Sequence, residues 1–192
     1  MRALTLLTLA LIGLAACGPK AEAPAKAAEQ PAQPDPAVAE KQKQAEQKTA
    51  FDAAGGDEAK IDALADAGNG FALYSRGKKR TESQEYVQQQ GGFADLEAAA
   101  DGGNADAQLW VGEKMAYGQM GYPLKPNSGL MMMEKAAKQD NVDAILAVAL
   151  MYEQDTFMRD LAKAKTWYER GVALGSAKAK EELAKLGEQK NY

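Results

Sequence analysis

Apolar residues recur three or four positions apart along most of the chain from Phe51 onward. This spacing, within alanine-rich runs that are separated by Gly and Asn, is typical of amphipathic α-helices. No segment has the convincing alternation of apolar and polar residues that half-buried strands require. The pattern therefore predicts an all-α fold built from short helices.

The helical segments repeat along the chain. The tetrapeptide Asn-Ala-Asp-Ala at residues 104–107 returns with shifts of 37 and 35 residues, as Asn-Val-Asp-Ala at 141–144 and Ser-Ala-Lys-Ala at 176–179. A similar helix end precedes each copy, and a fainter copy spans residues 63–72. Units that contain two helices stack into α-solenoids, because one unit alone cannot bury its apolar face.

Glycine and proline mark the ends of these helices. Turns that contain glycine at residues 68–70, 102–104 and 175–176 suit helix C-caps, where left-handed backbone angles favour Gly or Asn. Pro123 and Pro126 lie between the two helices of the first clear unit, where they interrupt no helical hydrogen bond. We therefore expect short helices that are separated by defined turns.

These units resemble the Sel1-like repeat, a relative of the tetratricopeptide repeat with two antiparallel helices per unit. The first-helix pattern of that family, A-x-x-x-L-G-x-x-Y-x-x-G, is similar to residues 107–118 and 144–155. Its second-helix pattern, A-x-x-W-Y-x-K-A-A, is similar to residues 164–172, and to residues 129–137 with methionine in place of both aromatics. The resemblance covers residues 96–186 and implies a short α-solenoid that binds another protein.

The N-terminal residues have the order of a secretory signal, with Arg2, an apolar stretch at residues 3–14 and small residues before Cys17. The apolar stretch is too short to remain as a membrane-spanning helix. The sequence Leu-Ala-Ala-Cys that ends at Cys17 resembles the lipobox of bacterial lipoproteins. This resemblance implies removal of residues 1–16 and attachment of acyl chains, such as palmitate, to Cys17. Gly18 follows Cys17 where an acidic residue would retain the protein in the inner membrane, so we expect the outer membrane, on its periplasmic face.

Residues 17–48 have the composition of a linker. They consist mostly of Ala, Pro, Gln, Glu and Lys, contain five of the seven prolines of the chain, and have almost no large apolar side chain. Such a segment cannot bury a core, and proline favours an extended backbone. We therefore expect a flexible tether at residues 17–48, with some helix after Ala37, and a Sel1-like repeat domain at residues 49–192.

The composition argues against several functional classes. The chain has no histidine and one cysteine, so neither a Ser-His-Asp nor a Cys-His arrangement exists and no internal disulfide forms. We expect no enzymatic activity and no cofactor. The formal net charge of −4 argues against nucleic-acid binding. The three methionines at residues 131–133 point about 100° apart on a helix, so we expect them to fill the core rather than bind a metal.

Three aromatic residues are candidates for partner binding. Trp110 stands at a variable position of the first-helix pattern, where repeat proteins of this type present side chains to a concave groove. Tyr117 and Tyr122 are close to it in the sequence. Aromatic side chains on such a surface are frequent anchors in protein interfaces. The alternative interpretation, in which Trp110 packs under a neighbouring helix, stays open.

Together these features favour a membrane-anchored lipoprotein that binds a protein partner through a helical-repeat groove. Lipoproteins with similar repeats act as immunity proteins, and this resemblance suggests a secreted antibacterial effector as the partner. The alternative is a structural or envelope-maintenance lipoprotein that has no toxin partner.

Overall fold

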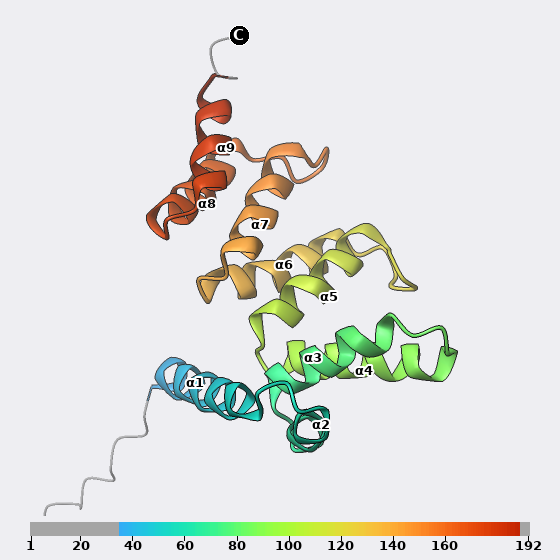
Figure 1. The fold of residues 1–192 in the computed structure, drawn as a ribbon. Helices are drawn as coiled ribbons and strands as arrows, with labels where there is room; N and C mark the ends of the chain where they lie inside the picture. Colours follow the sequence, from blue (N-terminus) through green and yellow to red (C-terminus); the bar gives the residue numbers. More distant parts are fainter. Residues whose placement is uncertain (1–34, 189–192) are drawn as a thin grey trace, which may run out of the picture. The chain divides into compact units, whose positions relative to one another are not determined.

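The computed structural model describes residues 35–188, which belong to one compact unit. This part of the chain forms nine α-helices and contains no strand (Figure 1). The helices are α1 Pro36–Ala54, α2 Glu58–Asp66, α3 Gly70–Thr81, α4 Tyr86–Asp101, α5 Ala105–Tyr117, α6 Pro126–Lys138, α7 Val142–Gln154, α8 Leu161–Ala173 and α9 Ala177–Glu188. The prediction of an all-α fold is confirmed.

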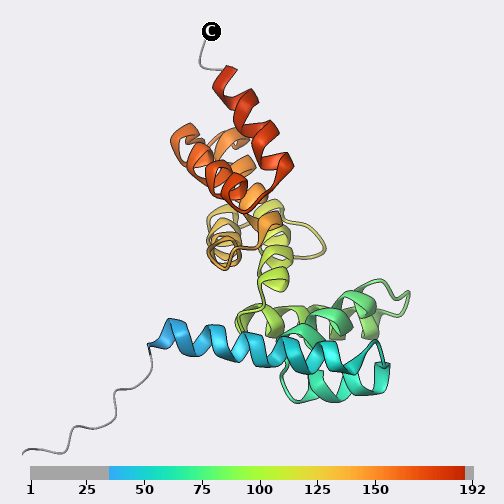
Figure 2. The same ribbon diagram turned by 60° about the vertical axis from the view of Figure 1, so that its left-hand side comes forward.

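Consecutive helices pack as pairs. α3 packs along α4, α5 along α6 and α7 along α8, and the pairs contact one another through α4 with α5 and through α6 with α7. α2 packs on the first pair and α9 on the last. We call α3, α5, α7 and α9 the first helices, and α4, α6 and α8 the second helices. The arrangement is a short α-solenoid (Figure 1 and Figure 2).

One kind of turn recurs between the pairs. A residue with positive φ precedes a capping residue, whose side chain accepts a hydrogen bond from the backbone of the next helix. The residues with positive φ are Gly68, Gly103, Asp140 and Gly175, and the capping residues are Asn69, Asn104, Asn141 and Ser176. The spacing of 35, 37 and 35 residues includes the faint copy at residues 63–72. The left-handed glycines expected in these turns are therefore confirmed.

The two helices of a pair approach each other closely at glycine. A Cβ atom added at Gly129 in α6 would lie 2.6 Å from the Ala116 nitrogen, and one added at Gly112 in α5 would lie 2.9 Å from the Gly129 oxygen. These distances leave no room for a side chain, so the two backbones are in direct contact. α3 and α4 meet in the same way at Gly77 and Gly92.

Small side chains also let successive units pack closely. A fully buried alanine stands three residues after every capping residue, at Ala72, Ala107, Ala144 and Ala179. Larger side chains fill the core from one equivalent position of the second helices, namely Leu96, Met133 and Tyr168. Each of these three is at most 1% exposed, so one pattern of small and large residues recurs through the core.

α1, which precedes the helix pairs, is attached by polar contacts as well as by the stacking of Phe51 on Phe71. The Gln44 amide donates a hydrogen bond of 3.0 Å to the Gly102 carbonyl, in the turn before α5. The Gly70 backbone N–H donates one of 3.2 Å to the Gln47 side-chain oxygen, in the turn before α3. Figure 2 shows α1 running beside α2 and α3, with which it is in contact. α1 is therefore part of the folded unit.

The expected domain boundary is corrected by this helix. The helix expected after Ala37 is present. Residues 36–48 lie in α1, which packs on α2 and α3, so they belong to the folded unit rather than to the tether expected at residues 17–48. Their polar composition hid the packing, because glutamine side chains rather than an apolar stripe make the contacts. The signal expected at residues 1–16 and the lipidation site at Cys17 lie outside the described residues. None of the helices in residues 35–188 is long and apolar enough to cross a membrane.

The consecutive methionines of α6 have different environments. Met133 is 1% exposed and belongs to the core, and Met132 is half-buried against it. Met131 is 64% exposed. The prediction of core packing is therefore confirmed for Met133 and wrong for Met131, because a helix directs successive side chains to different sides.

We predict that Gly129→Ala lowers the free energy of unfolding by roughly 1–3 kcal/mol, because its methyl group forces α5 and α6 apart. Urea unfolding followed by circular dichroism measures the change. Gly187→Ala in α9 is the matched control, since a Cβ atom there meets nothing within 4 Å. An unchanged unfolding midpoint for Gly129→Ala would show that the close approach is dispensable.

Candidate partner-binding surfaces

The exposed sides of α5, α7 and α9 line a groove of about 490 Å³, which we call the inner groove. α5 contributes Leu109, Glu113 and Tyr117, which are four residues apart and therefore lie on one face of the helix. α7 contributes Leu146 and Leu150 in the same way. Tyr117 is 54% and Leu150 is 41% exposed, so part of this apolar lining is open to solvent.

The floor of the inner groove consists of core side chains from the second helices. Met133 and Tyr168 line it and are each 1% exposed. The Tyr168 hydroxyl donates a hydrogen bond of 2.8 Å to a Glu153 carboxylate oxygen. Burial, together with this carboxylate, raises the pKa of Tyr168. The floor is therefore held in place by the same packing that stabilises the fold.

Acidic side chains outnumber basic ones along the inner groove. Glu113, Asp143 and Glu182 line it, and Lys178 is the one basic residue among the lining residues. Glu113 and Asp143 form no ion pair or hydrogen bond through their carboxylates within residues 35–188. Burial raises the pKa of Glu113; the nearby Lys114 opposes this and the charge of Asp143 adds to it. Two carboxylates that form no ion pair therefore interact across α5 and α7.

The negative potential extends from the inner groove toward α3. Burial raises the pKa of Tyr74 on α3, and the charges of Asp106, Glu113 and Asp143 add to the increase. Burial likewise raises the pKa of Tyr117, with a contribution from Glu113. Carboxylates of α5 and α7 therefore act electrostatically on tyrosine side chains of α3 and α5.

Trp110 lies outside the lining of the inner groove, in a cluster of aromatic rings. Its ring centroid is 6.2 Å from that of Phe93 and 6.2 Å from that of Tyr122. The ammonium groups of Lys78 and Lys114 lie 5.7 and 5.6 Å from the Trp110 ring centroid, at the distance of cation–π contacts. Because Tyr122 follows α5, the cluster holds the α5–α6 connection against α4.

The three aromatic residues expected to bind a partner are therefore divided between two places. Trp110 and Tyr122 contact each other and are partly buried, whereas Tyr117 lies in the inner groove. The Tyr122 hydroxyl is buried and has no hydrogen-bond partner in the described part of the chain. Burial raises the pKa of Tyr122, and the charge of Glu97 adds to the increase. The role of these three residues in binding stays a prediction.

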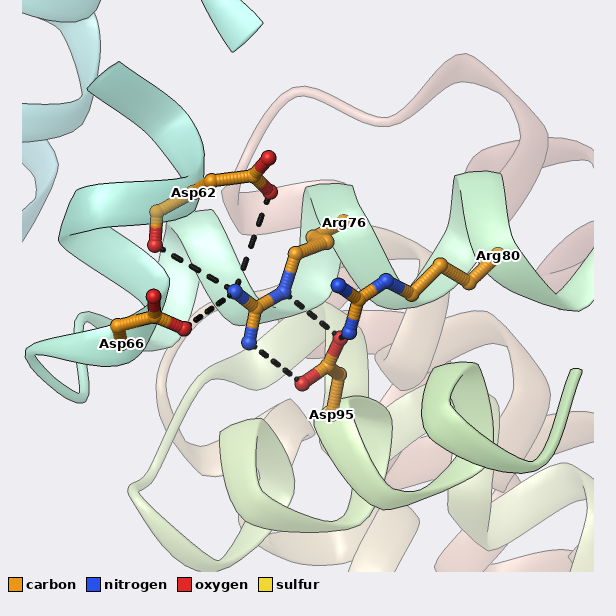
Figure 3. Close-up of polar contacts among 5 residues, drawn as sticks. All are labelled: Asp62, Asp66, Arg76, Arg80 and Asp95. Carbon is orange, nitrogen blue, oxygen red and sulfur yellow. Dashed lines mark hydrogen bonds and ion pairs between the residues drawn. The ribbon is translucent and has the colours of Figure 1, made fainter. Parts of the chain in front are cut away.

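The first helix pair contains a network of ion pairs that the sequence analysis missed (Figure 3). Arg76 donates to both carboxylate oxygens of Asp95, at 2.9 and 2.8 Å, and to Asp66 at 2.7 Å. Arg80 donates to Asp95 at 2.9 Å. The side chains of Arg76 and Asp95 are 12% and 10% exposed. The hydrogen bond to Asp95 is the main cause that raises the pKa of Arg76, although burial opposes it.

A comparison of equivalent positions in the repeats could have revealed this network. The positions of Arg76 and Arg80 in α3 correspond to Val111 and Met115 in α5, because the shift is 35 residues. Asp95 in α4 corresponds to Met132 in α6 and to Trp167 in α8, with shifts of 37 and 72 residues. Charged residues at positions that are apolar in the other pairs mark a local change of packing.

A pocket of about 590 Å³ adjoins this network between α2 and α3. Its lining includes Arg80, Lys79, Glu58 and Asp62, and Lys79 pairs with Glu58. Charges of both signs are therefore already balanced here, which favours a structural link between the helices. Within residues 35–188, no group of three or more His, Cys, Asp or Glu side chains is placed to hold a metal ion.

The stacked helix pairs and the recurring capped turn define an α-solenoid of the helix-pair repeat class. A Sel1 repeat protein from Oxalobacter formigenes is similar, with a TM-score of 0.60 and 27% identity over 67% of this chain and 98% of that one. A protective antigen present in uropathogenic Escherichia coli strains, which displays an SLR fold, gives a TM-score of 0.56 and 21% identity over 66% of this chain and 27% of that one.

These similarities establish that the chain has the Sel1-like repeat fold, as the sequence resemblance predicts. No protein-family model and no curated protein sequence matches the chain. The Sel1-like repeat fold commonly mediates protein–protein interaction and is typically a non-enzymatic scaffold.

We predict different effects for Trp110→Ala and Tyr117→Ala. Trp110→Ala removes the centre of the aromatic cluster and lowers the free energy of unfolding by about 2 kcal/mol, whereas Tyr117→Ala, at an exposed site, changes it by less than about 0.5 kcal/mol. Thermal unfolding measures both. A Trp110→Ala chain of unchanged stability that no longer bound a partner would instead make Trp110 an anchor of the interface.

Proposed function

We propose that this chain is a non-catalytic, membrane-anchored lipoprotein whose inner groove binds a segment of a partner protein. The observation that supports the proposal is the composition of the groove, which combines exposed apolar side chains with carboxylates that form no ion pair or hydrogen bond within residues 35–188. Glu113 is half-buried, and a partly desolvated carboxylate without an ion pair is unfavourable in the free protein. A bound cation removes this penalty, so the groove selects its ligand by charge as well as by apolar contact.

The chemistry of the groove defines the segment that fits it. Leucine side chains at Leu109, Leu146 and Leu150 offer apolar contact, and Glu113 and Asp143 offer a site for a Lys or Arg side chain. The segment is therefore apolar and basic, and it contacts α5 and α7 together. Charge complementarity of this kind mainly controls the choice of partner and the rate of association.

The membrane anchor of the proposal is a lipid on Cys17. It is supported by the resemblance of residues 14–17 to the lipobox and by the signal-like order of the residues before them. Several acyl chains on one cysteine attach a protein durably to a bilayer, whereas one chain alone binds reversibly. We place the protein at the outer membrane, on its periplasmic face.

More specifically, we propose that the partner is a secreted antibacterial effector and that this chain is its immunity protein. The support is the resemblance to lipoproteins with similar repeats, together with an anchor in the compartment that an effector enters. An effector gene beside the gene of this chain, with a one-to-one complex of the two products, supports this form. A chain that captures only abundant envelope proteins favours the alternative, a structural or envelope-maintenance lipoprotein.

An array of random 12-residue peptides tests the groove. We expect the bound peptides to be enriched in Leu, Phe, Lys and Arg, and the enrichment in Lys and Arg to be lost in the double variant Glu113→Gln/Asp143→Asn. For one bound peptide, calorimetry should give an affinity about tenfold lower in this variant. Glu46→Gln/Glu169→Gln removes the same charge from exposed positions on α1 and α8 and should have no effect. Equal enrichment in both double variants would refute charge selection.

The same binding should depend on pH through Glu113. A bound cation favours the ionised carboxylate, so affinity falls as the pH drops through the pKa of Glu113. Because burial raises this pKa, the loss begins at a higher pH than for an exposed glutamate. The double variant Glu113→Gln/Asp143→Asn should lack this dependence, which separates it from a general effect of acid on the fold.

Labelling with radioactive palmitate tests the anchor separately. We expect the chain to incorporate the label and to sediment with the outer membrane, and we expect Cys17→Ala to abolish incorporation. A labelled Cys17→Ala chain, or an unlabelled chain with Cys17 intact, would contradict the proposed anchor without bearing on the groove.

A further inference from the structure

Exposed apolar side chains gather where each first helix connects to its second helix. We define the loop edge as residues 82–87, 118–125 and 155–160, which comprise these three connections and the first two residues of α4. Its exposed large apolar side chains are Tyr86, Val87, Met120, Leu124 and Phe157, exposed by 73%, 78%, 48%, 67% and 95%. They are half of the exposed large apolar residues found in residues 35–188, although the loop edge is a small part of that range.

The topology of the solenoid brings the three connections to one edge. α3, α5 and α7 occupy equivalent places in successive pairs, so their C-terminal ends point the same way. In Figure 1 the connections α3–α4, α5–α6 and α7–α8 all project at the right-hand ends of their pairs. The turns between pairs, such as the one at Gly102 that contacts α1, lie at the opposite ends.

The connections hold their apolar side chains outward by defined contacts. Asp155 accepts hydrogen bonds of 2.8 and 2.9 Å from the backbone N–H groups of Phe157 and Met158, which fixes the turn that exposes Phe157. The Lys125 N–H donates a hydrogen bond of 2.8 Å to the Met115 carbonyl, next to the exposed Leu124. Exposing such side chains to water is unfavourable in proportion to their area. Side chains that the fold holds outward in this way are available for contact with an apolar medium.

We propose that the loop edge rests on the surface of a zwitterionic lipid bilayer. This inference rests on the membrane anchor of the proposed function. The apolar side chains project from three separate connections rather than forming one contiguous patch. Separate tips can each enter the interfacial region of a bilayer, whereas a protein partner needs a continuous complementary surface.

The length of chain before α1 allows this contact. Seventeen residues, 18–34, separate Cys17 from Asp35, and an extended chain of that length spans roughly 55 Å. A helix of 13 residues, as in α5 to α8, is about 20 Å long, so the tether is long enough to reach past the solenoid from one edge to the other. A lipid on Cys17 would then keep the loop edge permanently near the bilayer.

The charge of the loop edge determines which lipids it accepts. Its acidic residues are Glu82, Glu85, Asp155 and Asp160, and its basic residues are Lys125 and Arg159. This excess of negative charge is repelled by anionic headgroups and tolerated by zwitterionic ones. The occupant is therefore a surface rich in phosphatidylethanolamine or phosphatidylcholine.

Fluorescence quenching in vesicles tests the inference with the chain purified from the bacterial envelope. A cysteine that carries a bimane fluorophore replaces Phe157 or Leu124 at the loop edge, and Leu174, 43% exposed in the turn before α9, in the matched control. The vesicles consist of phosphatidylethanolamine and brominated phosphatidylcholine. We expect at least twofold quenching at positions 157 and 124, none at 174, and weaker quenching when phosphatidylglycerol replaces half of the lipid.

Absence of quenching at both loop positions, or equal quenching at position 174, would overturn the inference. Flotation of the chain with the vesicles is measured in the same samples and reports on the anchor alone. A chain that floats without quenching keeps its anchor and loses the lipid contact of the loop edge. A chain that does not float refutes the anchor and, with it, the lipid contact of the loop edge that rests on the anchor.

Discussion

The close approach of two helices within the first two pairs is the constraint on which the rest of the solenoid depends. Gly112 and Gly129 bring the backbones of α5 and α6 into contact, and Gly77 and Gly92 do the same for α3 and α4. These pairs stack through the buried alanines of the first helices, and large core residues come from the second helices and from Ile145 and Val148 of α7. The exposed sides of α5, α7 and α9 are thereby left free to line the inner groove, whose floor is the core itself.

The ion-pair network marks the first pair as different from the others. Arg76 and Asp95 occupy positions where α5, α6 and α8 have apolar side chains, and Arg76 also reaches Asp66 in α2. A buried ion pair contributes little net stability, because desolvation offsets the attraction of the charges, but removing one partner leaves an unpaired charge. The network therefore determines the position of α2 on the first helix pair, rather than adding stability to the core.

The sequence predicts the repeated helices and turns well, because they depend on local residues at a regular spacing. Asparagine caps and glycines with positive φ identify them without any knowledge of tertiary contacts. Asp140 is harder to recognise, since it takes the glycine position of its turn, where its carboxylate accepts hydrogen bonds from Arg170. The sequence predicts part of α1 as a tether, because Gln44 and Gln47 attach this helix through polar contacts, which leave no periodic apolar pattern.

The candidate site was less predictable, because it depends on which side of a helix each residue faces. Trp110 and Glu113 are three residues apart on α5, yet one packs with Phe93 and the other lines the inner groove. Tyr117 lies at the end of the inner groove and directly precedes the loop edge, so the two proposed surfaces share a border on α5. A partner segment that reaches Tyr117 would therefore lie beside the proposed lipid surface, where its apolar side chains are favoured. The groove and the loop edge would then act on the same ligand, the groove by selecting its charge and the bilayer by limiting where it can approach.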